Sequence, residues 1–157
     1  MSEMIRVLGG LLLVAAGTGG GIAVYSRKYH QWRQLHTFAR LLAYLRELLA
    51  YQPLNGGELL ARAARYPAFA RLGVGECGTL AALPLPGALP PGTRQELQQG
   101  LEQLAFEPRS NACATLKRLE TLCEDAAVSK REESQAARRL CPRLGACAGM
   151  LAAILLW

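Results

Sequence analysis

The sequence lacks the short motifs around which common enzyme active sites are built. It has no phosphate-binding loop ending in Lys and Ser or Thr, no nucleophile elbow, no zinc-protease motif and no dinucleotide-binding fingerprint. The one glycine-rich run, residues 17–21, contains no lysine and lies within an apolar stretch. These absences predict a protein that is not an enzyme, with no catalytic residues and no bound cofactor.

Metal-binding and nucleic-acid-binding patterns are also missing. None of the five cysteines forms a C-x-x-C pair, and His30 and His36 are six residues apart, on different faces of a helix. We therefore expect reduced, scattered thiols and no metal site. Only three Phe and two Trp are available to stack on bases, so the chain is not expected to bind nucleic acid despite its net charge of +6.

The basic residues are instead concentrated beside two uncharged runs, residues 7–26 and 144–157. Five Lys and Arg against one Glu follow the first run, in residues 27–51, and five against two precede the second, in residues 129–143. Basic residues beside apolar segments favour the anionic, cytoplasmic face of a membrane. The pattern predicts a cell-membrane protein that contacts anionic lipid, with the bulk of the chain in the cytoplasm and both termini outside.

The two runs differ in length. Residues 7–26 are long enough for a membrane span, and a cleaved signal peptide is the alternative. Residues 144–157 reach only about 21 Å as a helix, so they predict either a short membrane segment or a buried core helix. Each run holds two glycines four residues apart, a spacing that lets membrane helices approach closely. The predicted membrane helix-packing residues are Gly17, Gly21, Gly145 and Gly149.

The middle of the chain is typical of a helical bundle. Apolar residues alternate at spacings of three and four in residues 35–49 and 112–126. Capping-box patterns at residues 55–58 and 93–96 predict two further helix starts. The helix that starts at residues 93–96 and the helix of residues 112–126 make a predicted αα-hairpin. The proline-rich residues 83–92 are consistent with a loop packed on the bundle or with a polyproline ligand.

Together these patterns predict an all-α fold, a small helical bundle flanked by an N-terminal and a C-terminal membrane segment. The predicted domains are a transmembrane helix at residues 1–26, a cytoplasmic bundle at 27–139 and a membrane segment at 140–157. Arg33, Arg40 and Arg46 are six or seven residues apart and predict one polar stripe along the first helix. With Glu47 they are the candidate partner-binding residues, and the alternative is that the stripe faces lipid head groups.

Two blocks of sequence resemble a known family. The first is Arg33-Gln34-Leu35, followed by Glu47-Leu48, Tyr51 and Pro53-Leu54. The second is Leu119-Glu120, followed by Leu144-Gly145-Ala-Cys-Ala-Gly149 and a Leu/Ile-rich end. In this order they resemble the stage III sporulation protein AB family of endospore-forming bacteria, and the order, length and two apolar ends are also similar.

The resemblance implies a helical domain similar to the cytoplasmic domain of the F-type inner-membrane platform proteins of type II secretion. It further implies a structural subunit of a secretion-like sporulation channel between mother cell and forespore, in the mother-cell membrane. The implied partners are the other channel subunits, including a cytoplasmic secretion-type ATPase. From the residues alone, a membrane-tethered adaptor or regulator unrelated to sporulation stays an alternative, as does an exported helical protein whose N-terminal segment is cleaved.

Overall fold

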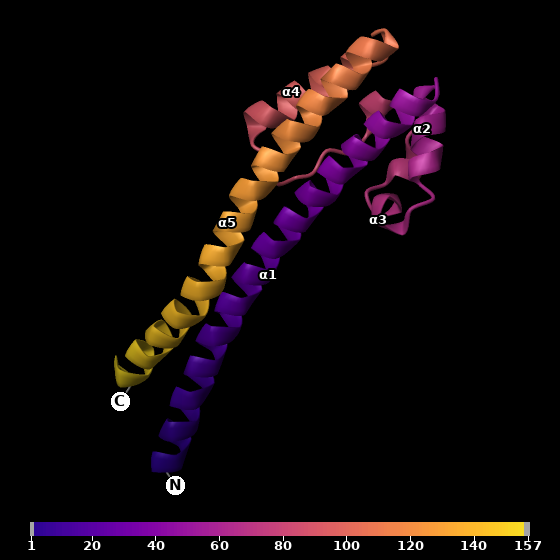
Figure 1. Ribbon diagram of the computed structural model, residues 1–157. Coiled ribbons are helices and arrows are strands. Elements are labelled where there is room, and N and C mark those ends of the chain that lie inside the picture. Colours follow the sequence, from indigo (N-terminus) through magenta and orange to yellow (C-terminus); the bar gives the residue numbers. More distant parts are fainter. Residues whose placement is uncertain (1, 156–157) are drawn as a thin grey trace. The chain divides into compact units, whose positions relative to one another are not determined.

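The computed structural model describes residues 2–155, with the side chains at 2–7, 13, 142, 152, 153 and 155 left out. Its described residues form helices and no strand, as the predicted all-α class requires (Figure 1). Residues 1, 156 and 157 of the predicted membrane segments lie outside the described residues. In chain order the elements are α1 (Ser2–Tyr51), α2 (Gly56–Ala63), α3 (Pro67–Ala70), the 3₁₀ turns η1 (Val74–Glu76) and η2 (Leu80–Ala82), α4 (Pro91–Gln103) and α5 (Arg109–Leu155).

The chain forms two compact units. The bundle unit is Gln31–Val128, and the terminal unit combines residues 1–30 with residues 129–157. The long helices α1 and α5 each contribute one part to each unit. The bundle unit is therefore shorter at both ends than the cytoplasmic bundle predicted at residues 27–139.

The core of the bundle unit is built from the predicted apolar seams. Leu35, Phe38, Leu42 and Leu45 of α1 are buried, whereas Leu49 at the end of the seam is half-buried. The seam of α5 is buried in the same way, except that Ala127 replaces the predicted Ala126 as its last fully buried position. Other buried side chains of this core come from the shorter elements and the loop after η2: Leu59, Leu60, Phe69, Val74, Leu83, Leu97 and Leu101.

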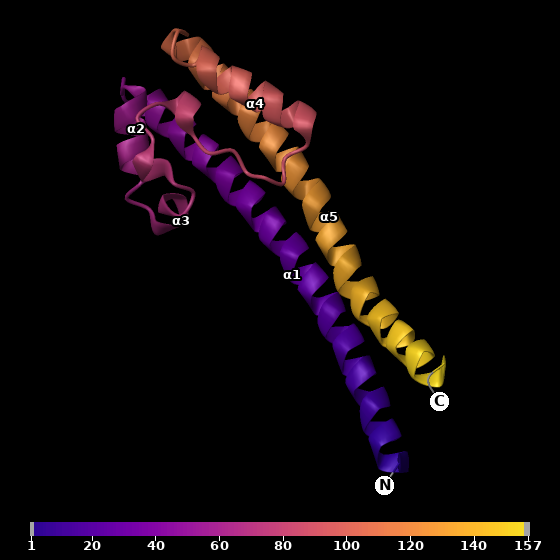
Figure 2. The same cartoon turned by 180° about the vertical axis from the view of Figure 1, so that it is seen from behind.

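Two glycines shape the short elements of the bundle unit. Gly73 has φ +77°, a left-handed conformation that lets the chain turn between α3 and η1. Gly100 faces α5, where an added Cβ would lie 2.8 Å from Leu119 Cδ2. The two members of the predicted hairpin, α4 and α5, therefore pack closely because position 100 has no side chain (Figures 1 and 2).

The predicted helix ends are partly correct. α1 ends at Tyr51 as expected, and the capping box of α2 is present, with the backbone N–H of Asn55 donating to the Glu58 carboxylate at 3.3 Å. The second capping box is wrong, because α4 begins at Pro91, before Thr93. Proline is favoured in the first turn of a helix, where its missing N–H is not needed, and the Pro90-Pro91 pair thus sets the start.

The proline-rich segment is a packed loop. Leu83 and Leu89 are buried, and Leu89 contacts a small cluster with Leu35 and Ala127. Residues 83–90 therefore form the packed loop that the sequence predicts as one alternative, and residues 91 and 92 belong to α4.

The terminal unit holds the apolar parts of α1 and α5. By length and composition, α1 is the one helix within the described residues that qualifies as a membrane span. The helical run Leu8–Tyr51 includes an 18-residue apolar window of which none is buried. The predicted segment 140–157 is the end of α5, which continues through position 142 without a break. Its role as a membrane segment stays a prediction.

Candidate functional site

The predicted polar stripe of α1 is divided by the structure. Arg33, Arg40 and Glu47 are exposed and follow each other at intervals of seven residues, so they share one face of the helix. No ion pair of these three side chains occurs within the described part of the chain. We refer to Arg33, Arg40 and Glu47 as the α1 stripe.

Arg46 does not belong to this exposed stripe, which corrects the expectation that it lies in line with Arg33 and Arg40. Its Nε lies 3.0 Å from Glu120 Oε2 on α5, and only 31% of its side chain is exposed. The Glu120 side chain is 7% exposed and also contacts Lys117 Nζ at 3.2 Å. Since one residue along a helix turns the side chain by about 100°, Arg46 points to α5 while Glu47 points to solvent.

The contact between Arg46 and Glu120 is an ion pair rather than an aligned hydrogen bond, since neither Arg46 Nε nor Glu120 Oε2 has a hydrogen-bond partner. Removing a buried charge's partner leaves that charge uncompensated. Arg46 therefore stabilises the bundle and is not free to bind a partner.

Arg109 at the start of α5 closes the end of α1. Its Nε donates to the Leu49 carbonyl at 2.7 Å, and its Nη2 donates to the Ala50 carbonyl. The last carbonyls of a helix have no partner within the helix, and a cation there also meets the negative end of the helix dipole. Sequence reasoning missed both Arg109 and Glu120, because their partners lie far along the chain.

The end of the bundle that Arg109 closes contains a cavity of about 470 Å³. Leucines from five elements line much of it, and Glu107 and Arg109 contribute the charged groups. The leucines are Leu49, Leu54, Leu59, Leu80, Leu101, Leu104 and Leu116. Such a lining suits an apolar side chain and offers no pair of groups for proton transfer.

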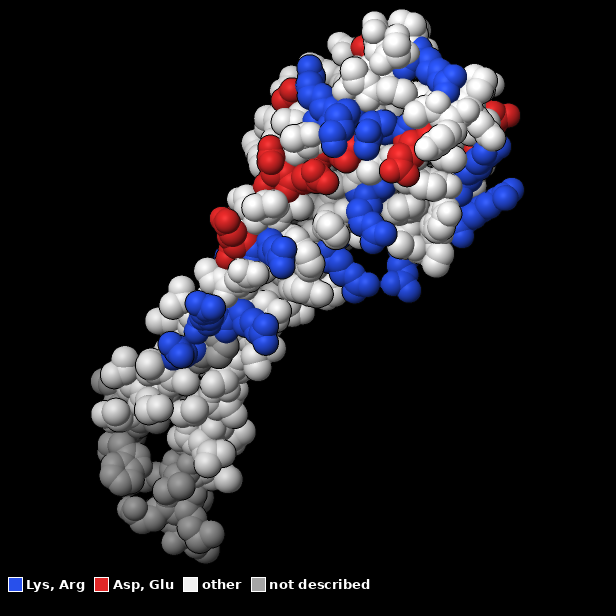
Figure 3. Space-filling view, viewed as in Figure 1, with Lys and Arg blue, Asp and Glu red and all other residues white. Residues whose placement is uncertain are grey.

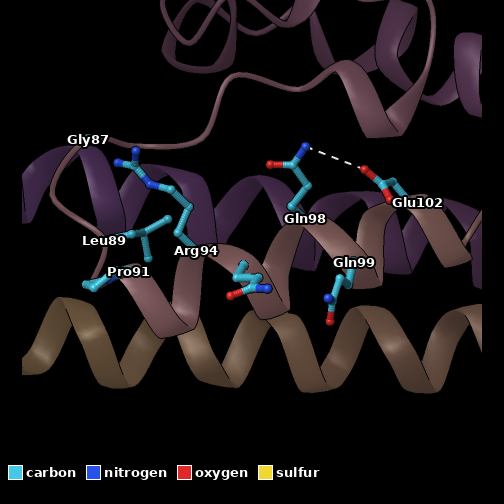
Figure 4. A pocket seen from close by; sticks show the side chains of 8 residues that line it. Gly87, Leu89, Pro91, Arg94, Gln98, Gln99 and Glu102 are labelled. Atoms are coloured by element: carbon cyan, nitrogen blue, oxygen red, sulfur yellow. Dashed lines mark hydrogen bonds between the residues drawn. The ribbon is translucent and has the colours of Figure 1, made fainter.

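A second hollow, of about 500 Å³, follows α4 and the loop before it (Figure 4). Three glutamines, Arg94 and Glu102 supply its polar lining. Arg94 Nη2 is already engaged with the Pro86 carbonyl at 3.1 Å, and Gln98 donates to Glu102 at 3.5 Å. Arg94, Gln98 and Glu102 are therefore already hydrogen-bonded within the chain, and we read the hollow as a polar surface rather than a shaped ligand site.

The cysteines and histidines do not come together. Among the described residues, no three His, Cys, Asp or Glu side chains are placed to hold a metal ion. His36 stacks on Trp32, with ring centroids 5.7 Å apart. Cys123 is fully buried in the core, and burial raises the pKa of its thiol to about 12, so it is held in the unreactive neutral form.

Two of the four predicted helix-packing glycines contact each other in the terminal unit. A Cβ at Gly17 would overlap the carbonyl group of Gly145, and a Cβ at Gly145 would overlap that of Gly17. Gly149 is buried and Gly21 is half-buried. By contrast, Gly19 and Gly20 have open space where a Cβ would be, so the close approach is specific to one face of α1.

Comparison of the chain with models of protein families, with characterised proteins and with solved structures finds no match.

Proposed function

We propose that the chain is a non-enzymatic membrane platform subunit that holds a helical docking domain at the cell membrane. One observation carries this proposal: a single helix, α1, contains both the unburied apolar window and the buried seam of the bundle. A helix that serves as span and core joins the anchor to the domain without a flexible linker.

The sporulation role rests on the resemblance to the stage III sporulation protein AB family. It gives the proposal its specific form, a subunit of a secretion-like channel in the mother-cell membrane, with the bundle in the cytoplasm and a secretion-type ATPase as partner. The basic residues that flank both apolar runs support the cytoplasmic orientation.

The α1 stripe is the proposed docking face for this partner. Arg33 and Arg40 are exposed and free of ion pairs within the described residues, and Glu47 ends the stripe with the opposite charge. A partner surface with acidic groups facing the two arginines fits this pattern, because electrostatic complementarity sets the orientation of docking.

The test reverses the charges of the stripe without touching the core. The double variant Arg33→Glu/Arg40→Glu should stay folded and in the membrane but lose at least about tenfold in co-purification with the ATPase, which corresponds to about 1.4 kcal/mol. Arg65→Glu/Arg71→Glu is the matched control, since both positions are exposed in the bundle unit and the net charge change is the same. Arg46 stays unchanged because its substitution would test folding.

The co-purification belongs in an endospore-forming host at low salt, because salt screens exposed charges beyond about 8 Å at physiological ionic strength. Equal yields from the stripe variant and the wild-type chain would contradict the docking face. A wild-type chain that captures other membrane proteins but no ATPase would contradict the channel role and favour the unrelated adaptor.

A further inference from the structure

Two contacts define how α1 and α5 are aligned in the terminal unit. Gly17 lies against Gly145, and Lys28 Nζ lies 3.9 Å from Glu133 Oε2. Both contacts give nearly the same antiparallel register, in which one step forward along α1 corresponds to one step back along α5. In this register Arg143 lies beside Gly19, and Arg139 lies one turn away, beside Ala23.

These two arginines are thus placed beside the uncharged run of α1, which ends only at Arg27. Both are exposed, and they are four residues apart, so they lie on one face of α5. Like charges at this spacing repel, and no carboxylate within the described residues pairs with either arginine. Exposed Leu140 and Leu144 adjoin them. At the edge of a membrane, this unpaired cation pair is placed to meet anionic groups from outside the chain.

The length of the unit gives the same conclusion. Counted on α1 alone, the distance from Arg6 to Arg27 is about 31 Å, close to the roughly 30 Å hydrocarbon core. For the two helices together, the uncharged part ends where Arg143 of α5 lies beside Gly19 of α1. Its length from Arg6 to that level is about 20 Å. A membrane edge at Arg27 would bury the charge of Arg143 about 12 Å inside hydrocarbon, where a charged side chain costs several kcal/mol.

Two of the α1 residues at this level, Gly19 and Gly20, lose little by leaving the hydrocarbon, and the exposed side chains of Ile22 and Val24 would then lie among the head groups. Gly19 and Gly20 are exposed, with open space around their Cα atoms, and so contribute almost no apolar side-chain surface. Figure 3 shows Lys and Arg side chains gathered at one level of the terminal unit, next to a described surface that carries no charge.

We propose that Arg139 and Arg143 bind the phosphate groups of anionic phospholipids and place the membrane edge at the level of Gly19–Ala23 of α1. The edge then lies one to two turns inside the run that the sequence assigns to the membrane. The bilayer thins around the pair to match its short uncharged length, as occurs for short spans, and the arginines extend to the head groups. This inference rests on the proposed membrane anchoring.

Thiol labelling of the full chain in phosphatidylglycerol nanodiscs tests the position of this edge. A charged, water-soluble maleimide labels thiols outside the hydrocarbon, and peptide mass spectrometry reads each cysteine separately. The native Cys147 is exposed and lies beyond Arg143, so it is the internal reference for the hydrocarbon. Ser26→Cys is the reference for water, and Ala23→Cys is the test position.

We expect Ala23→Cys to react at a rate close to that of Ser26→Cys and at least about tenfold faster than Cys147, because an apolar environment suppresses the reactive thiolate. In the background Arg139→Gln/Arg143→Gln, the helix pair should sink and the rate at Ala23→Cys should fall at least about threefold. The control background Arg65→Gln/Arg71→Gln, which removes the same charge from the bundle unit, should leave that rate unchanged.

The outcomes separate this inference from the anchoring itself. Slow labelling of both Ala23→Cys and Cys147 would leave the anchor intact and overturn the proposed edge. Fast labelling of Cys147 would show that the unit is not in the bilayer and would overturn both. Equal rates at Ala23→Cys in phosphatidylglycerol and phosphatidylcholine discs would overturn the binding of anionic lipid, since only the anionic surface adds to the attraction of each arginine.

Discussion

Glu120 is the residue in the bundle unit whose charge is most deeply buried. Its carboxylate is held between Arg46 of α1 and Lys117 of α5, and 5% of the residue is exposed. A buried ion pair adds little net stability compared with apolar residues, yet removing one partner is costly. The main role of the ion pair is therefore to fix the alignment of α1 and α5 in this unit, rather than to add stability.

Substituting this carboxylate tests that role. Because Arg46 is about one-third exposed, we expect Glu120→Gln to cost about 2 kcal/mol of unfolding free energy, less than for a fully buried pair. The control is Glu96→Gln, which removes an exposed pair with Arg118 at 3.2 Å and should cost less than about 0.5 kcal/mol. Chemical denaturation of the full chain in detergent gives both values, and similar losses from the two variants would contradict the role assigned to Glu120.

The burial of Cys123 predicts how the stability of the chain changes at alkaline pH. Its pKa rises from 9.0 to about 12 on folding because burial disfavours the thiolate. A group with a raised native pKa contributes its full stability below pH 9.0, and that contribution is lost as pH rises towards about 12. The stability difference between the wild-type chain and Cys123→Ala should be constant below pH 8, and it should shift in favour of the variant from pH 9 upwards. Parallel stability curves up to about pH 11 would contradict the assigned burial.

At the scale of elements, the glycine contact between α1 and α5 is specific enough to test with matched variants. Gly17→Val places a side chain where the Gly145 carbonyl lies, whereas Gly20→Val on the same helix meets open space. We expect the first to destabilise the full chain in detergent by about 1–3 kcal/mol, as overpacking does, and the second to change stability by less than about 0.5 kcal/mol. Thermal unfolding compares them, and equal shifts would argue against the contact.

The elements also explain which features the sequence could predict. The seams of α1 and α5 were predictable because apolar spacing reports which helix face is buried, and Phe38 and Leu119 are fully buried as expected. The start of α4 was not predictable, because Thr93 offers a plausible cap while Pro91 is equally suited to the first helical turn.

The candidate site shows the same division between local and distant information. Spacing alone predicts a stripe of Arg33, Arg40 and Arg46, and the structure exposes the first two but turns Arg46 towards α5. Arg46 lies one residue off the seven-residue spacing of the α1 stripe, and its partner Glu120 lies on another helix, which no local pattern reports. Arg109 binds backbone carbonyls, which every residue has, so its role leaves no trace in residue type.

At the scale of the whole molecule, the proposed platform subunit needs an anchor that is retained and a bundle that lies in the cytoplasm. The basic residues beside both apolar runs predict this orientation. Gly87, in the loop before α4, is exposed and has open space around it, so an inserted reporter domain there should leave the bundle folded.

The most direct test compares two reporters inserted after Gly87 in the full-length chain. A fluorescent protein that matures only in the cytoplasm should be bright and membrane-bound, and alkaline phosphatase, which is active only outside, should be inactive at the same position. The intact mass of the purified membrane-bound chain should include the N-terminal residues, which excludes a cleaved signal peptide. Active phosphatase, or a soluble chain that has lost its first residues, would contradict a membrane-anchored cytoplasmic docking domain.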